Sequence, residues 1–134
     1  YVRRWYFDKE TGKELFFSYE TYVSDGTITL EELAQMHIGS SEPAQAYTIQ
    51  GCPAAGAVVG ELAPHSDVVW IQGTQENGLS FLLSSADYSV EELVQIAESV
   101  RKQQSVINCK KERTGQFRRF APFVLWYEIC NLNA

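Results

Sequence analysis

One phrase in the chain constrains the fold most: two strand-like segments that are followed at once by a helix with a marked start. Residues 66–73 and 79–86 are rich in branched and aromatic side chains, and the pair Asn77–Gly78 between them is a strong hairpin signal. In the helix that follows, Ser89 occupies the N-cap position and Glu92 lies three residues later, which is the spacing of a capping box. The phrase therefore predicts an antiparallel hairpin that leads directly into a helix.

The predicted helix is amphipathic. Its apolar side chains recur every three or four residues and so form one stripe, which we expect to face a core: Val90, Leu93, Val94, Ala97 and Val100. The adjacent acids Glu91 and Glu92 resemble a catalytic carboxylate pair. Neighbouring side chains on a helix point about 100° apart, however, so the two carboxylates do not converge. We interpret them as capping residues.

A second copy of the same pattern lies earlier in the chain. "ITLEELAQM" (28–36) matches "YSVEELVQI" (88–96), with Thr29 as the cap and Glu32 as its partner. Each copy follows a predicted hairpin in which a Trp and a Phe are eleven residues apart: Trp5 with Phe16, and Trp70 with Phe81. Two explanations stay open. One is a duplicated strand–strand–helix unit, and the other is two unrelated capped helices that each follow a hairpin.

The remaining segments complete an α+β fold. We predict strands over 1–7, 14–23 and 47–51, a loop that passes into a strand over 52–62, and a last strand within 123–130. The fold class that follows is a mainly antiparallel twisted sheet of five to seven strands, with two helices packed on one face. The 134 residues suit a single domain, 1–134, in which 105–134 is a C-terminal extension of open role.

The charge is distributed unevenly along the chain. Residues 1–100 carry four Lys and Arg against fifteen acids, whereas residues 101–134 carry seven against two. The net charge of −6 argues against nucleic acid as the partner of the whole domain. The basic segment 110–119 is nevertheless a candidate anion-binding stretch, through Lys110, Lys111, Arg113, Arg118 and Arg119. Its alternative role is to lie against the acidic body.

Neither the cysteines nor the histidines form a recognisable site. Cys52, Cys109 and Cys130 include no CxxC pair, so we predict no metal site and no cofactor. A disulfide between Cys109 and Cys130 and three unpaired thiols are both open. Cys52 with His65 is the one candidate for a thiol nucleophile and its base, and its alternative is a small buried cysteine. We therefore expect the chain not to be an enzyme.

Three aromatic side chains on the predicted strands are candidates for ligand binding. A sheet with both helices on one face leaves its other face open, and Tyr19, Trp70 and Phe81 would line that face if they are exposed. The alternative is that the aromatic stripes form the core, because such rings bury large apolar areas.

Residues 47–100 resemble a known family. Four features carry the resemblance: "GCPA" before a strand, "VVW" opening the next strand, Phe81 in the return strand, and "SVEELVQIAESV" as the closing helix. They resemble a bacterial domain of unknown function found in the extracytoplasmic C-terminal part of anti-sigma-factor-like, membrane-anchored proteins and lipoproteins. The family domain closes near this last helix, so residues 105–134 fall outside the resemblance.

The resemblance implies a role rather than a set of catalytic residues. It implies a non-catalytic sensing or binding domain outside the cytoplasm, whose partner is a protein, a peptide or a cell-envelope component. The chain starts at Tyr1, without a methionine. We accordingly expect the natural polypeptide to continue upstream, with a membrane anchor in that upstream part.

Overall fold

The computed structural model describes residues 2–40, 42–103, 114–116 and 125–128. Side chains are described up to residue 100, and only the backbone beyond it. The elements along the chain are β1 (Val2–Phe7), β2 (Glu14–Val23), α1 (Leu30–Met36), β3 (Gln45–Ile49), β4 (Cys52–Val59), β5 (His65–Gly73), β6 (Asn77–Ser85), α2 (Val90–Glu98), β7 (Val100–Gln103), β8 (Thr114–Gln116) and β9 (Leu125–Glu128).

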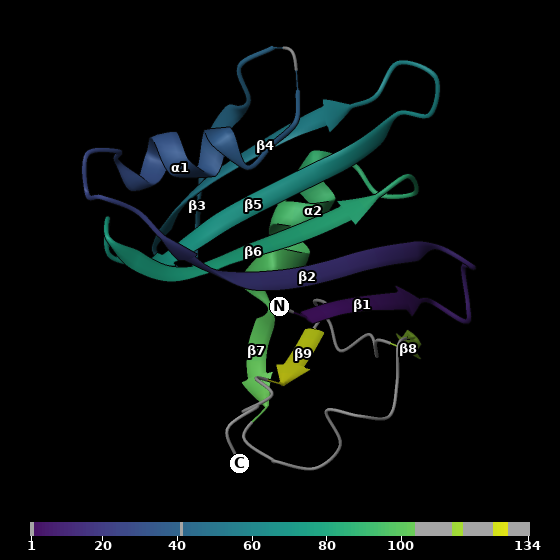
Figure 1. The fold of residues 1–134 in the computed structure, drawn as a ribbon. Helices are drawn as coiled ribbons and strands as arrows, with labels where there is room; N and C mark the ends of the chain where they lie inside the picture. Colours follow the sequence, from purple (N-terminus) through teal and green to yellow (C-terminus); the bar gives the residue numbers. More distant parts are fainter. Residues whose placement is uncertain (1, 41, 104–113, 117–124, 129–134) are drawn as a thin grey trace.

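The main sheet has the strand order β3-β4-β5-β6-β2-β1-β8 (Figure 1). The six strands from β3 to β1 pair antiparallel, and β8 pairs with β1 in parallel. Strands β7 and β9 form a separate parallel pair. The prediction of an α+β fold with a mainly antiparallel sheet is thus confirmed.

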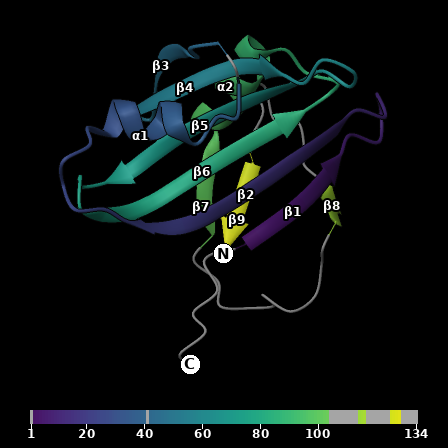
Figure 2. The same cartoon turned by 45° about the horizontal axis from the view of Figure 1, so that its top comes forward.

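The two helices lie on opposite faces of this sheet. On β5, Val68 and Trp70 join the core under α2, whereas the alternate residues Val69 and Ile71 join the core under α1. Figures 1 and 2 show α1 and α2 on the two sides of the sheet. The prediction that both helices share one face is therefore wrong. The run "VVWI" on β5 is apolar at successive positions. Successive side chains point to opposite faces of the sheet, so other elements must cover both faces of this strand.

Both capping boxes form as predicted. The Ser89 hydroxyl accepts from the Glu92 N–H, and the Glu92 carboxylate accepts from the Ser89 N–H, each at 3.1 Å. Thr29 and Glu32 make the same reciprocal pair at the start of α1. Each pair satisfies two backbone donors that the helix itself leaves unpaired, which explains why each helix begins at the residue where it does.

The β5–β6 hairpin is also confirmed, but its turn is not made by Asn77 and Gly78. Both residues belong to β6, and Gly73 pairs directly with Gly78, so the connection between the two strands is 74–76. A Cβ on Gly78 would lie 2.4 Å from the carbonyl oxygen of Gln72. Glycine is needed there because two backbones approach closely.

Strand β4 begins earlier than predicted. Gln50 and Gly51 both have positive φ, 53° and 74°, and form a two-residue turn that pairs Ile49 with Cys52. Of the predicted loop and strand over 52–62, the strand is confirmed as Cys52–Val59, but the loop before it is wrong. Pro53 is tolerated because the β4–β5 pairing begins one residue later, at Ala54.

The two Trp–Phe pairs are direct cross-strand neighbours. Trp5 lies opposite Phe16, and Trp70 lies opposite Phe81. The first pair is on the α1 face and the second on the α2 face, because Trp5 alternates with the core residue Tyr6. The same spacing thus places one aromatic pair toward each side of the sheet.

Candidate functional site

The described residues cover only part of the α1 face of the sheet. Helix α1 packs over β4 and β5 through Leu33 and Ala34, and Ile38, just after the helix, joins the same core. Helix α2 spans β3 to β6 on the other face. Among the described residues, neither helix packs over the α1 side of β6, β2 and β1 as α1 packs over β4 and β5. A hollow of about 600 Å³ lies there, lined by Arg3, Phe16, Ser18, Glu20, His37, Val69, Ser80 and Leu82.

The strand register builds the floor of this hollow. Arg3 pairs with Ser18, Ser18 with Leu82, and Leu82 with Val69, so these side chains form one row across four strands. Glu20 pairs with Ser80 in the next row. The two serines are buried, whereas Arg3 and Glu20 are exposed. The floor is thus apolar with small hydroxyls, and the rim carries both signs of charge.

His37 joins α1 to this floor. It is the C-cap of α1, and its Nδ1 lies 2.6 Å from the Ser80 hydroxyl oxygen. One of the two groups donates and the other accepts, according to the tautomer of the imidazole ring. The contact gives the buried Ser80 hydroxyl a partner and places an exposed imidazole at the wall of the hollow.

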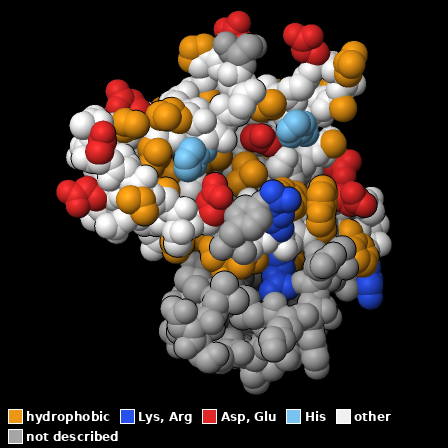
Figure 3. Space-filling view, viewed as in Figure 1, with side chains coloured by type: hydrophobic (Ala, Val, Ile, Leu, Met, Phe, Trp, Pro, Cys, Tyr) orange, Lys and Arg blue, Asp and Glu red, His pale blue; other side chains and the backbone are white. Residues whose placement is uncertain are grey.

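An exposed aromatic strip continues the hollow along β1. The side chains of Trp5 and Phe7 are 51% and 41% exposed. The ring centroids of Trp5 and Phe16 are 4.8 Å apart, so Phe16 belongs to both the hollow and the strip. A smaller hollow of about 260 Å³ lies at the far end of the strip, beside Glu14. Figure 3 shows apolar, basic and acidic side chains side by side on this face.

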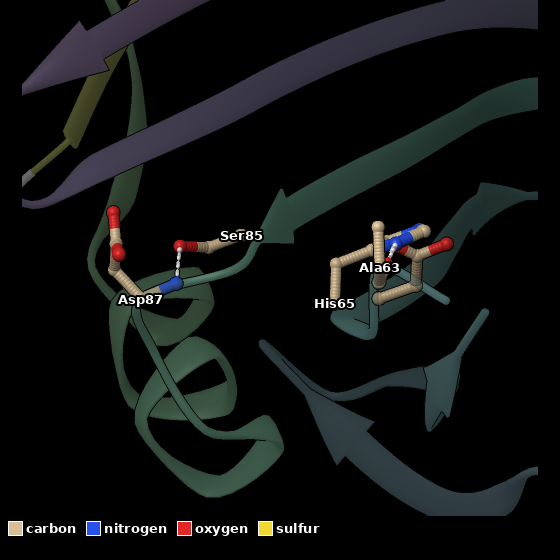
Figure 4. A network of polar contacts seen from close by, with 5 residues as sticks. Ala63, His65, Ser85 and Asp87 are labelled. Carbon is tan, nitrogen blue, oxygen red and sulfur yellow. Dashed lines mark hydrogen bonds and ion pairs between the residues drawn. The ribbon is translucent and has the colours of Figure 1, made fainter. Parts of the chain in front are cut away.

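His65, the other histidine, makes local contacts at the start of β5. Its Nδ1 lies 3.3 Å from the Ala63 carbonyl oxygen, and its Nε2 lies 3.4 Å from a carboxylate oxygen of Asp67. The nearby Ser85 hydroxyl donates to the Glu14 carbonyl and accepts from the Asp87 N–H (Figure 4). Ser85 therefore orders the chain before α2, and these residues do not form a Ser–His–Asp triad.

The structure does not bring Cys52 and His65 together. Cys52 begins β4, whereas His65 pairs with Val59 at the other end of that strand. Seven residues of extended chain separate the two ends, roughly 23 Å at about 3.3 Å per residue. Burial, and secondly the charge of Glu98, raise the pKa of the Cys52 thiol. A raised pKa disfavours the thiolate that a nucleophile requires.

Tyr19, Trp70 and Phe81 are core residues rather than a ligand surface. They are 4%, 2% and 1% exposed and lie under α2. The rings of Trp70 and Phe81 stack with centroids 5.0 Å apart. The prediction that they line an open face is corrected for the same reason as above, since α2 covers this face.

The basic candidates Lys110, Lys111, Arg113, Arg118 and Arg119 lie outside the described residues, as do Cys109 and Cys130. Among the described side chains, no group of three or more His, Cys, Asp and Glu residues converges as metal ligands would. In the described part of the chain, neither helix has the length and apolar composition needed to cross a bilayer.

No protein-family model, curated protein or solved structure matches this chain.

The hollow was not predicted from the sequence, although the sequence contains a signal for it. Ser18 and Ser80 occupy strand positions that alternate with core aromatics, where a fully covered sheet face would carry apolar side chains. Small polar residues at such positions indicate a face that a helix does not cover.

Proposed function

We propose that the chain is a non-catalytic binding domain whose hollow on the α1 face receives a peptide segment of a partner protein. The observation that carries this proposal is the open hollow itself, which continues into the exposed rings of Trp5 and Phe7. Aromatic anchors beside a polar rim are the composition of interface hot spots. We expect the partner peptide to place an apolar side chain against Phe16 and Leu82 and a basic side chain beside Glu20.

The setting we propose follows the resemblance of residues 47–100. In that setting the domain works outside the cytoplasm, as the sensing or binding part of a membrane-anchored regulatory protein or lipoprotein. Labelling of the chain by a membrane-impermeant reagent in intact producing cells tests the location. Labelling only after lysis would contradict it.

Peptides selected from a random display library against the full chain test the binding site. We expect Trp5→Ala to weaken the selected peptides by more than about tenfold, since truncating a hot-spot aromatic costs about 2 kcal/mol or more. Met36→Ala is the matched control, because Met36 is an exposed apolar side chain on α1 that does not line the hollow. It should leave affinity unchanged.

Charge reversal gives a second, independent comparison. Glu20→Lys and Glu31→Lys change the net charge equally, but only Glu20 lines the hollow, while Glu31 lies in the first turn of α1. We expect Glu20→Lys to weaken binding of a basic peptide and Glu31→Lys to leave it nearly unchanged. Selected peptides that bind all four variants as they bind the unmodified chain would refute the site.

A further inference from the structure

The two edges of the main sheet differ in how the chain covers them. At one edge, β8 pairs in parallel with Trp5, Tyr6 and Phe7 of β1. At the other edge, β3 pairs with β4 and with no other described strand. Within the described part of the chain, β3 is thus an open edge strand.

The register identifies the backbone groups that this edge presents. Ile49 and Cys52 flank the two-residue turn and form a hydrogen-bonded pair, so Tyr47 and Ala54 form the next such pair. The alternate residues Ala46 and Thr48 therefore point their N–H and C=O groups away from β4. No described residue bonds to these groups, and both side chains are exposed.

Side chains from the two helices close both ends of this open stretch. Ala44 donates its N–H to the Gln35 carboxamide oxygen at 2.9 Å and accepts from the Gln35 amide at 2.7 Å. The Gln50 N–H donates to the Glu98 carboxylate at 3.0 Å and 3.1 Å. The unsatisfied part of the edge is therefore confined to residues 46–48.

Strand β3 lacks the features that usually protect an edge. Proteins block open edges with Lys, Pro or a bulge. The sequence "QAYTI" contains no charged residue and no proline, and its five residues pair with β4 without interruption. Nothing within the strand itself prevents another extended segment from adding to it.

The described charged side chains around this edge are acidic. The Tyr47 ring and the side chain of Val90, the first residue of α2, both lie against Gly56, so Glu91, the next residue of α2, lies near the middle of the strand. Burial, and secondly the charge of Glu91, raise the pKa of Tyr47. Glu98 lies at its end, and the exposed Glu42 precedes it. The described basic side chains belong instead to β1 and the following turn, in 3–13. A second copy of the chain would bring like charges together, whereas a basic segment would be attracted.

We propose that β3 is the docking edge for an extended, positively charged peptide segment of a partner protein. The segment adds to the sheet by hydrogen bonding to the outward backbone groups of Ala46 and Thr48. It places a Lys or Arg side chain on the α2 face, over the half-buried Tyr47 ring and beside Glu91. This site shares no residue with the hollow on the α1 face, so the two proposals stand or fall separately.

Proline substitutions at the edge test the backbone pairing directly. Ala46→Pro and Thr48→Pro each remove one outward N–H, and proline is tolerated where a strand's N–H faces solvent. Ala46→Val and Thr48→Val are the matched controls, because they change the side chain and keep the donor. The unfolding temperature of each variant is measured first. If the proline variants lose no more in unfolding temperature than the valine variants, the sheet is intact.

The probe is a blocked peptide of about eight residues, a usual strand length, that alternates Lys and Val. Titration of the full chain should give saturable binding, weakened at least about tenfold by either proline and less than about twofold by either valine. The same peptide with Glu in place of Lys should not bind. Glu91→Gln should weaken the Lys peptide and reduce its salt dependence, with Glu31→Gln as the control.

Three outcomes would overturn the proposal. One is equal binding of the Lys peptide to the proline and valine variants. Another is undiminished binding of a peptide whose alternate backbone nitrogens are methylated, because that peptide cannot donate to the edge. The third is dimerisation of the free chain that Ala46→Pro abolishes, which would make a second copy the occupant.

Discussion

Replacement of Leu93 by alanine tests whether the apolar stripe of α2 holds the helix to the sheet. Leu93 is fully buried in the core that also contains Trp70 and Phe81. The change removes three carbon atoms, which is about 2.4 kcal/mol at about 0.8 kcal/mol each. A residual hole of about 50 Å³ adds about 1.2 kcal/mol, at about 24 cal/mol per Å³. We therefore expect a loss of about 3–4 kcal/mol in the free energy of unfolding.

The assay is urea denaturation followed by far-UV circular dichroism, with the midpoint and the m value fitted separately. Gln95→Ala is the control on the same helix, because Gln95 is exposed and should change stability by less than about 0.5 kcal/mol. A loss below about 1 kcal/mol for Leu93→Ala, with an unchanged m value, would refute the packing of α2 on the sheet.

Three further predictions concern the hairpin, the helix cap and the thiol. Gly78→Ala should cost about 3 kcal/mol or more in a denaturant titration, since its Cβ would meet the Gln72 carbonyl at 2.4 Å. Ser89→Ala should cost about 1 kcal/mol, because it removes the hydroxyl of the capping box. Alkylation of Cys52 by iodoacetamide at pH 8 should be slower than that of a free cysteine, because its raised pKa lowers the thiolate fraction, and Glu98→Gln should speed it.

Each of these predictions has a contradicting result. Gly39→Ala is the control for the hairpin, because no atom lies within 4 Å of its Cβ position, and an equal loss in both variants would show that the close approach at Gly78 is absent. Retained stability in Ser89→Ala would mean that the cap contributes nothing. Alkylation is measured with Cys109 and Cys130 replaced by serine, and a rate equal to that of the free amino acid would contradict the raised pKa.

Local features of the fold could be predicted from the sequence because short-range chemistry decides them. The start of α2 depends on Ser89 and Glu92, which are three residues apart. Each hairpin depends on two strands that follow one another directly in the sequence. The start of β4 could not be predicted in the same way. It depends on Gln50, a non-glycine residue at positive φ, for which the sequence carries no strong signal.

The sides taken by the helices and the position of the hollow depend on long-range pairing. The apolar run of β5 predicts a strand but does not say which helix covers which side. The hollow exists because Ser18 pairs with Leu82, 64 positions further along the chain, and because α1 stops short of these strands. Only the register of β2 against β6 brings the two residues together, and sequence spacing does not encode that register.

The central claim is that the hollow on the α1 face binds a partner peptide, and the amide chemical-shift map of the peptide-bound chain tests it most directly. The peptide is the tightest one selected from the display library. We predict that the largest shifts fall on Phe16, Ser18, Ser80 and Leu82, with smaller shifts along Trp5 and Phe7. Shifts confined to α2, or to strand positions that face it, would contradict the claim.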